Sequence, residues 1–178
     1  NMKIGFGLML DKNSSDFAIK LEKELCKKFS VCWGLNQAPH IAIKRPFETN
    51  NIKEFEDYLD IIANKSKSFK VNLKGIGSFE EHTIFMDVIE NKALTELHFK
   101  ILDDLKEKGV NPNKFEREKV KFHSTLATRD LDKEKFYLAQ EYLKQYKIDF
   151  TFEAKEIGLF YYLEDKDEWI VTKVVSLK

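Results

Sequence analysis

The chain is organised around residues 121–129, which read Lys121-Phe122-His123-Ser124-Thr125-Leu126-Ala127-Thr128-Arg129. In a β-strand, successive side chains point to opposite faces. One face of this stretch would carry Lys121, His123, Thr125, Ala127 and Arg129. The other would carry Phe122, Ser124, Leu126 and Thr128. The alternation predicts a half-buried strand whose open face offers an imidazole, a hydroxyl and two cations, which are groups that suit a bound phosphate.

A second stretch with the same pattern lies earlier, at residues 39–47, and reads Pro39-His40-Ile41-Ala42-Ile43-Lys44-Arg45-Pro46-Phe47. Alternation would place His40, Ala42 and Lys44 on one face and Ile41 and Ile43 on the other. Pro46 is expected to end the strand, because proline has no N–H to donate to a neighbouring strand. Two strands that each present a histidine predict one cleft with two imidazoles.

The composition describes a folded protein with no general affinity for nucleic acid. A chain of 178 residues is long enough for one domain with a sizeable core. Hydrophobic residues make up 43% and charged residues 34%, which is typical of a globular protein and not of a disordered one. The 30 basic and 30 acidic residues cancel, which excludes broad electrostatic binding of nucleic acid. Any recognition of phosphate must therefore be local.

The two cysteines, Cys26 and Cys32, form no CxxC motif and no disulfide framework, so we expect reduced thiols in a reducing compartment. No stretch approaches the roughly 20 apolar residues of a membrane span. The N-terminus lacks the pattern of a signal peptide. These observations predict a cytoplasmic protein without a membrane partner. Asn1, which precedes Met2, is expected to be the remainder of a removed tag.

Hydrophobic spacing divides the chain into alternating strands and helices. The predicted strands cover residues 3–10, 39–46, 69–76, 83–89, 121–129, 148–163 and 169–177. The predicted helices cover residues 17–29, 50–65, 93–108 and 131–146. The second half repeats the first apart from its opening strand, and each histidine strand lies between two helices.

This order predicts an α+β fold, built as a single domain over residues 2–178. Its two pseudo-symmetric lobes would cover roughly residues 2–90 and 91–178. Each lobe would hold a mainly antiparallel sheet with helices outside, and a central groove would lie between the lobes.

At His40 and His123 the chain resembles the two-histidine (2H) phosphoesterases, which include 2'-5' RNA ligase-like proteins and 2',3'-cyclic nucleotide phosphodiesterases. Their pattern is a pair of H-x-T/S motifs, one in each lobe. The second motif, His123-Ser124-Thr125, matches in full, whereas the first has Ala42 where a hydroxyl is expected. RNA-ligase-like members often carry an arginine five positions after the second histidine. Here Thr128 holds that position, and the arginine follows as Arg129.

Flanking residues support the resemblance over nearly the whole chain. Pro39 precedes the first histidine, and Arg45-Pro46-Phe47 follows its strand. The stretch Leu73-Lys74-Gly75-Ile76-Gly77-Ser78-Phe79 fits the glycine-marked hairpin of the family.

The resemblance implies a metal-independent phosphoesterase in which His40 and His123 act as general acid and base. Imidazole suits both roles because its ordinary pKa of about 6.5 lies near neutrality. The predicted phosphate-binding residues are Thr125, Lys44, Lys121 and Arg129, and the candidates for stacking a base are Trp33 and Phe47. The four histidines form no HxH or HExxH motif, so neither a metal nor a cofactor is predicted. His98, on a predicted helix, is expected to be a packing or surface residue.

The predicted substrate is an RNA terminus or a small nucleotide with a 2',3'-cyclic or 2'-5' phosphodiester, and no protein partner is predicted. The alternative is a catalytically weak RNA- or nucleotide-binding protein on the same fold, which Ala42 favours. The retained pair of histidines favours the enzyme. Hydrolysis and ligation both stay open, because one arrangement of acid and base serves either direction.

Overall fold

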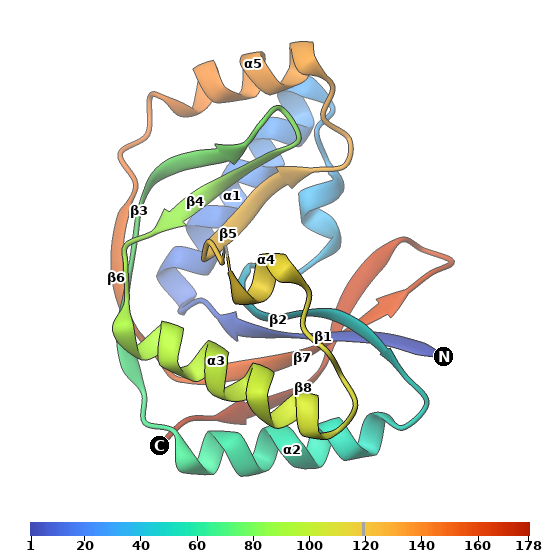
Figure 1. The fold of residues 1–178 in the computed structure, drawn as a ribbon. Helices are drawn as coiled ribbons and strands as arrows, with labels where there is room; N and C mark the ends of the chain where they lie inside the picture. The colour runs from blue at the N-terminus through green and yellow to red at the C-terminus, as the bar shows by residue number, and fades with distance from the viewer. Residues whose placement is uncertain (119) are drawn as a thin grey trace.

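The computed structural model describes residues 1–118 and 120–178 and shows an α+β fold with two four-stranded sheets (Figure 1). Neighbouring strands are antiparallel in both sheets. The first sheet has the order β2-β1-β7-β8, with β1 Met2–Met9, β2 His40–Thr49, β7 Glu156–Leu163 and β8 Glu168–Ser176. The second has the order β5-β4-β3-β6, with β3 Phe69–Phe79, β4 Thr83–Val88, β5 His123–Thr128 and β6 Asp149–Ala154. The predicted fold class is confirmed.

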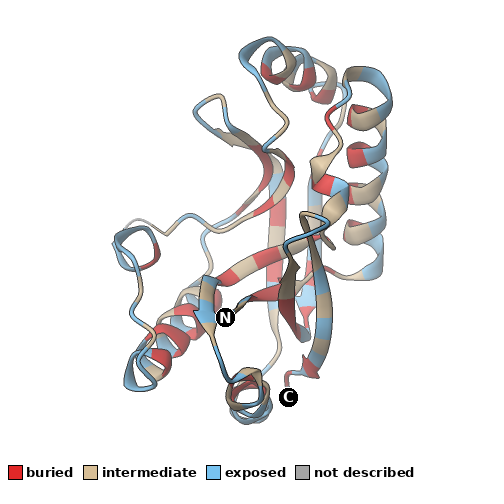
Figure 2. Ribbon diagram, turned by 90° about the vertical axis from the view of Figure 1, so that its right-hand side faces the viewer, coloured by how far each residue is buried: buried red, intermediate tan, exposed pale blue. Residues whose placement is uncertain are grey.

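The helices are amphipathic, with buried residues on one side and exposed residues on the other (Figure 2). They are α1 Lys12–Phe29, the 3-10 helix η1 Trp33–Asn36, α2 Ile52–Lys65, α3 Lys92–Glu107, α4 Lys114–Arg117 and α5 Lys133–Leu143. Each α-helix begins after an Asp or Asn whose side chain accepts a backbone N–H of the first turn. Among the described residues, no helix is long and apolar enough to span a membrane.

Each sheet is built from strands of both halves of the sequence. Helices α2 and α3 contact the first sheet, whereas α1 and α5 contact the second (Figure 1). The first sheet combines the first two strands of the chain with the last two. The expected lobe boundary near residue 90 therefore does not separate the sheets.

The segment predicted as one strand, 148–163, is two strands in different sheets. Its first part, β6, pairs with β3, and its second part, β7, pairs with β1. The break falls at Lys155. An apolar run without a turn signal continues across this break, which is why spacing alone predicted a single strand.

Strands β2 and β5 are each the outer strand of a sheet, and they contact one another at the middle of the molecule beside α4 (Figure 1). Pro46 lies inside β2 and does not end it, contrary to expectation. A proline is tolerated there because β2 stands at the edge of its sheet. The two histidine strands thus form the junction between the lobes.

Cys26 and Cys32 are joined by a disulfide, which links the end of α1 to the residue before η1. The expectation of reduced thiols was wrong, because the turn after α1 brings the two Cα atoms within 4.3 Å. The cysteines therefore no longer support a reducing compartment.

Candidate active site

Both histidine strands contain a β-bulge at the third residue after the histidine. In β2, Lys44 pairs with Phe6 and Ala42 pairs with Gly7, so Ile43 has no opposite residue. In β5, Ala127 pairs with Ile84 and Thr125 pairs with Phe85, so Leu126 has none. An extra residue in one strand reverses the alternation of every side chain that follows it.

The bulges place the fifth residue after each histidine, and not the fourth, on the histidine face. In β2 this residue is Arg45, which lines a cavity together with Ala42 and His123. Lys44 faces the opposite side, so its predicted place beside His40 was wrong. In β5 the fifth residue is Thr128, and Ala127 is fully buried on the other face. The predicted row along β5 was wrong beyond Thr125.

Lys44 is held in the interior by an ion pair. Only 3% of its side chain is exposed, and its Nζ lies 2.9 Å and 3.0 Å from the two carboxylate oxygens of Glu116. Burial lowers the pKa of Lys44, and the neighbouring Glu116 carboxylate opposes that shift. The carboxylate also accepts the backbone N–H of Arg45 at 3.0 Å. Lys44 therefore links α4 to β2, with its ammonium group buried against Glu116.

His98 completes this fastening from α3. Its Nδ1 lies 2.8 Å from the carbonyl oxygen of Ile43, and its Nε2 lies 2.8 Å from the carbonyl oxygen of Glu116. Ile43 is the bulged residue, so His98 supplies a partner for a carbonyl at the point where the strand pairing is interrupted. His98 is buried as expected, but it also lines the cavity.

The two motif histidines are anchored in the same way. His40 Nδ1 lies 2.7 Å from the carbonyl oxygen of Ala38, and His123 Nδ1 lies 2.6 Å from the carbonyl oxygen of Lys121. A carbonyl oxygen only accepts, so each Nδ1 donates its hydrogen. Each Nε2 is thereby left for a ligand, with the ring orientation fixed from behind.

An aromatic ring supports each imidazole. The Phe160 ring centroid lies 4.1 Å from that of His40, and the Phe85 centroid lies 4.9 Å from that of His123. Each support depends on a glycine: a Cβ on Gly7 would lie 2.7 Å from both the His40 and Phe160 rings, and one on Gly77 would lie 2.5 Å from Phe85. The small residues are therefore required by the position of the rings.

The two imidazoles differ in their electrostatic surroundings. Burial, together with repulsion from a positive charge on His123, lowers the pKa of His40 to about 4. Burial also lowers the pKa of His123, as do the cations Arg45 and Lys121, whereas Asp87 raises it. The two histidines lie on β2 and β5, which contact one another. His40 is the more strongly held in the neutral form.

The cavity beside His123 has a volume of about 320 Å³. Its walls come from five elements and the segment before β5, and they combine apolar with cationic groups: Ala42, Ile43, Arg45, Phe79, His98, Phe115, Glu116, Val120, Lys121 and His123. Lys121 was predicted, and its Nζ lies 2.7 Å from Asp87 Oδ1. Thr125 is half-buried on the His123 face.

Six predicted residues are not part of the lining of this cavity, namely His40, Thr125 and Lys44, described above, and Arg129, Trp33 and Phe47. Arg129 has its guanidinium carbon 4.3 Å above the Trp33 ring and pairs with Asp167. Trp33 Nε1 donates to Asp167 Oδ2 at 2.9 Å. Phe47 packs against Phe55, with ring centroids 4.9 Å apart. Trp33 and Arg129 thus fasten the β7–β8 hairpin to η1, and Phe47 belongs to the packing under α2.

Besides the supporting rings Phe85 and Phe160, the sequence interpretation missed Arg45, Phe79, Asp87 and Phe115 as residues of the site. One signal was present for Arg45, which stands five positions after His40, the same offset that the resemblance gives for an arginine after the second histidine. Phe115 lies on α4, a helix of four residues, which is too short for a periodic pattern.

The fold and the paired histidine strands define a two-histidine phosphoesterase. The sequence profile of the 2'-5' RNA ligase superfamily matches residues 13–166, and the chain belongs to that family. No curated protein matches the chain significantly.

Several solved structures share the fold over nearly their whole length. The protein TT0787 of Thermus thermophilus has a TM-score of 0.72 at 14% identity, covering 99% of this chain and 98% of that chain. LigT of E. coli complexed with 3'-AMP has a TM-score of 0.63 at 13% identity, with the same coverage. A protein described as a phosphoesterase has a TM-score of 0.63 at 11% identity, covering 100% of this chain and 99% of that chain.

Proposed function

We propose that the protein is a phosphoesterase that hydrolyses 2',3'-cyclic or 2'-5' phosphodiesters of RNA or small nucleotides. In this proposal His40 is the general base and His123 is the general acid. The observation that carries this proposal is the matched anchoring of both Nδ1 atoms, which leaves the Nε2 of each ring for a phosphate on two strands that contact one another. E. coli LigT is described in complex with 3'-AMP, which is the kind of monoester that opening of a 2',3'-cyclic phosphate yields.

The surroundings of the two rings support one assignment of the acid and base roles. His40, whose pKa is lowered to about 4, is neutral near pH 7 and accepts a proton at Nε2 from the attacking water. The water oxygen bonds to phosphorus as the bond from phosphorus to a ribose oxygen breaks. His123 reacts in its imidazolium form, which the nearby Asp87 carboxylate favours, and gives its Nε2 proton to that departing oxygen. The product is a phosphomonoester, and proton exchange with solvent resets both rings.

Negative charge on the non-bridging oxygens requires donors that are already in place. The Thr125 hydroxyl and the cations Arg45 and Lys121 share the His123 side of the site. Arg45 takes the place of the hydroxyl that Ala42 lacks in the first motif. Loss of one such donor costs about 2.7–4 kcal/mol of transition-state stabilisation in comparable sites.

The proposal is tested by incubating the protein with adenosine 2',3'-cyclic phosphate in the presence of a chelator and identifying the monoester formed. We expect turnover that survives the chelator, because the two histidines supply both proton transfers. Replacing His40 or His123 with Ala should reduce kcat by roughly 10²–10⁴-fold. His82→Ala is the matched control, since its side chain is 77% exposed in a turn. Activity that disappears with the chelator and returns with a divalent metal would contradict the mechanism.

A second candidate is a nucleotide-binding protein without turnover, which the missing hydroxyl at Ala42 favours. In that case 3'-AMP would bind in a manner that depends on His123, and no cyclic phosphate would be consumed by the wild-type protein.

A further inference from the structure

We propose that the cavity beside His123 binds the nucleobase of the leaving nucleoside, with Phe79 and Phe115 as stacking surfaces and Arg45 as a shared cation. This inference rests on the proposed function and extends it from the phosphate to the base. It makes a nucleoside cyclic phosphate a better substrate than a cyclic phosphate that has no base.

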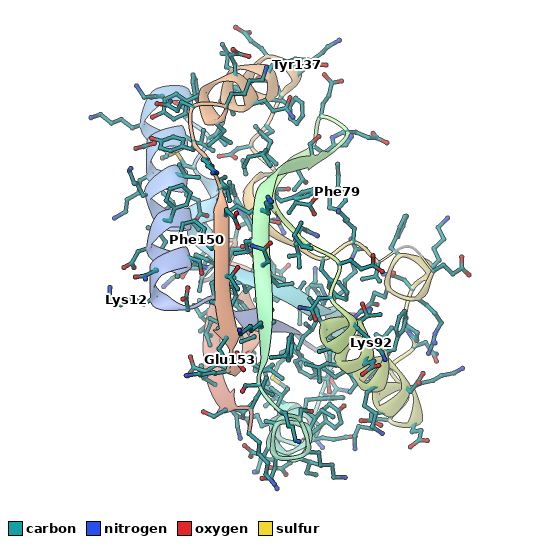
Figure 3. All side chains as sticks on the ribbon, turned by 90° about the vertical axis from the view of Figure 1, so that its left-hand side faces the viewer. Lys12, Phe79, Lys92, Tyr137, Phe150 and Glu153 are labelled. Carbon is teal, nitrogen blue, oxygen red and sulfur yellow. A yellow bond between two sulfur atoms is a disulfide. The ribbon has the colours of Figure 1, made fainter. Side chains whose placement is uncertain are left out.

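Phe79 forms the wall nearest the reaction. Its ring centroid lies 4.8 Å from that of His123, and 38% of its side chain is exposed. Figure 3 shows Phe79 on the side of β3 away from α1, whereas Phe150 lies on the side that faces α1. An exposed ring on the inner face of a sheet, next to an imidazole, offers a flat surface to a planar group.

Phe115 forms a second wall, from α4. Its side chain is 51% exposed although it borders a cavity, and the guanidinium carbon of Arg45 lies 5.6 Å from its ring centroid. Arg45 therefore connects this aromatic surface with the scissile phosphate near His123. Base stacking on an aromatic ring together with a guanidinium is a common way to hold single nucleotides.

The charges of the cavity suit a nucleotide. Among its described lining residues, Arg45 and Lys121 are the cations. Lys121 is paired with Asp87 and Glu116 with Lys44, so Arg45 supplies the net positive charge. Ala42 also lines the cavity, so the loss of the first-motif hydroxyl leaves room beside Arg45. Ala42 therefore accounts both for the missing hydroxyl and for the open space in the cavity.

The position of the cavity decides which nucleoside it holds. In the proposed mechanism His123 protonates the departing ribose oxygen, and this cavity borders His123. The nucleoside that carries the departing oxygen therefore has its base on the same side. Water approaches from the side of His40.

The test compares two substrates with the same five-membered cyclic phosphate, adenosine 2',3'-cyclic phosphate and glycerol 1,2-cyclic phosphate. The measured quantity is the ratio of their kcat/KM values. We expect the wild-type protein to prefer the adenosine substrate and Phe115→Ala to lower that ratio by about tenfold or more, the effect of losing one stacking ring. Tyr137→Ala, which removes an equally exposed ring (54%) on α5, is the control and should leave the ratio unchanged.

Two results would overturn the inference: equal kcat/KM for the two substrates in the wild-type protein, or an equal loss on both in Phe115→Ala. Absence of any turnover would contradict the proposed function instead. The cavity is then judged by titrating 3'-AMP and glycerol 2-phosphate calorimetrically. A preference for 3'-AMP that Phe115→Ala abolishes would support the base site, and equal binding of both would overturn it.

Discussion

The two histidine strands share a backbone plan but divide its chemistry between them. Each has a histidine anchored through Nδ1 and a bulge three residues later. In β2 the second and fifth residues after the histidine are Ala42 and Arg45, whereas in β5 they are Thr125 and Thr128. The hydroxyl comes from one strand and the close cation from the other. The hydroxyl that the first motif lacks is present in β5, and the arginine that β5 lacks at the fifth position is present in β2.

Their bulges are also supported by different means. The Nδ1 atom of His98 lies 2.8 Å from the bulge carbonyl in β2. In β5 the bulged residue is covered by η1, because a Cβ on Gly34 would clash with the carbonyl oxygen of Leu126 and would lie 2.7 Å from Glu22 Oε2. Glu22 is buried, and its other carboxylate oxygen has no hydrogen-bond partner among the described residues. The bulge in β2 is thus held by a polar contact with His98. The bulge in β5 is held by close packing against η1, next to the buried Glu22.

The largest effects are expected from replacing Arg45, which lines the cavity, and Lys44, which lies in a buried ion pair. Arg45→Ala should lower kcat by about 10²–10³-fold, because it removes a preorganised donor from the phosphate, while the free energy of unfolding changes little. Lys44→Met should do the reverse: it leaves the Glu116 carboxylate buried without its partner and should destabilise the fold by about 3–5 kcal/mol. Steady-state kinetics and urea unfolding of both variants check this. An Arg45→Ala variant with normal kcat would show that the bulge does not aim this side chain at the phosphate.

The support under the β5 bulge predicts a stability that depends on pH. Burial raises the pKa of Glu22 from its usual 4.5 to about 9, so the folded state holds a proton that the unfolded state has released. Stability should therefore fall as the pH rises from about 4.5 to about 9. Glu22→Gln should remove this fall and stabilise the protein by about 3 kcal/mol at pH 7. Urea unfolding at several pH values measures it, and parallel curves for both proteins would contradict the burial argument.

Asp87 distinguishes the surroundings of the two histidines. It raises the pKa of His123 against the lowering effects of burial, Arg45 and Lys121, and His40 has Met9 in the corresponding position. In the pH profile of kcat/KM, the acid limb should reflect His40 and the alkaline limb His123. Asp87→Asn should lower the pKa of His123 and move only the alkaline limb to lower pH. A shift of the acid limb instead would exchange the two roles.

The smallest expected effect concerns Ala42. Restoring a hydroxyl with Ala42→Thr would add about 0.5–1.5 kcal/mol of binding to the transition state if a donor were missing, which is roughly two- to tenfold in kcat/KM on every substrate. Because Arg45 already occupies that role and Ala42 lines the cavity, we expect a fall of similar size that is confined to the nucleoside substrate. Kinetics on adenosine and glycerol cyclic phosphates decide between these outcomes.

Sequence patterns predicted the elements that depend on local signals. Helices were found at all four predicted places, although α1 begins at Lys12 and not at residue 17, and His40 and His123 lie on strands as the alternation indicated. What the patterns missed depends on pairing between distant segments. A bulge is defined by the opposite strand, so the opposite orientations of Lys44 and Arg45 are invisible in a single stretch. The exchange of sheets at Lys155 is likewise set by tertiary packing.

The most direct test of the account is a double-mutant comparison on adenosine 2',3'-cyclic phosphate, with kcat measured for the wild type, His40→Ala, His123→Ala and the double variant. If the two strands serve one phosphate, each single change should lower kcat by roughly 10²–10⁴-fold. The double variant should then be about as slow as the slower single variant, because acid and base act as a unit. Losses that multiply, or a single variant with near-normal turnover, would show that the two histidines do not act on the same phosphate.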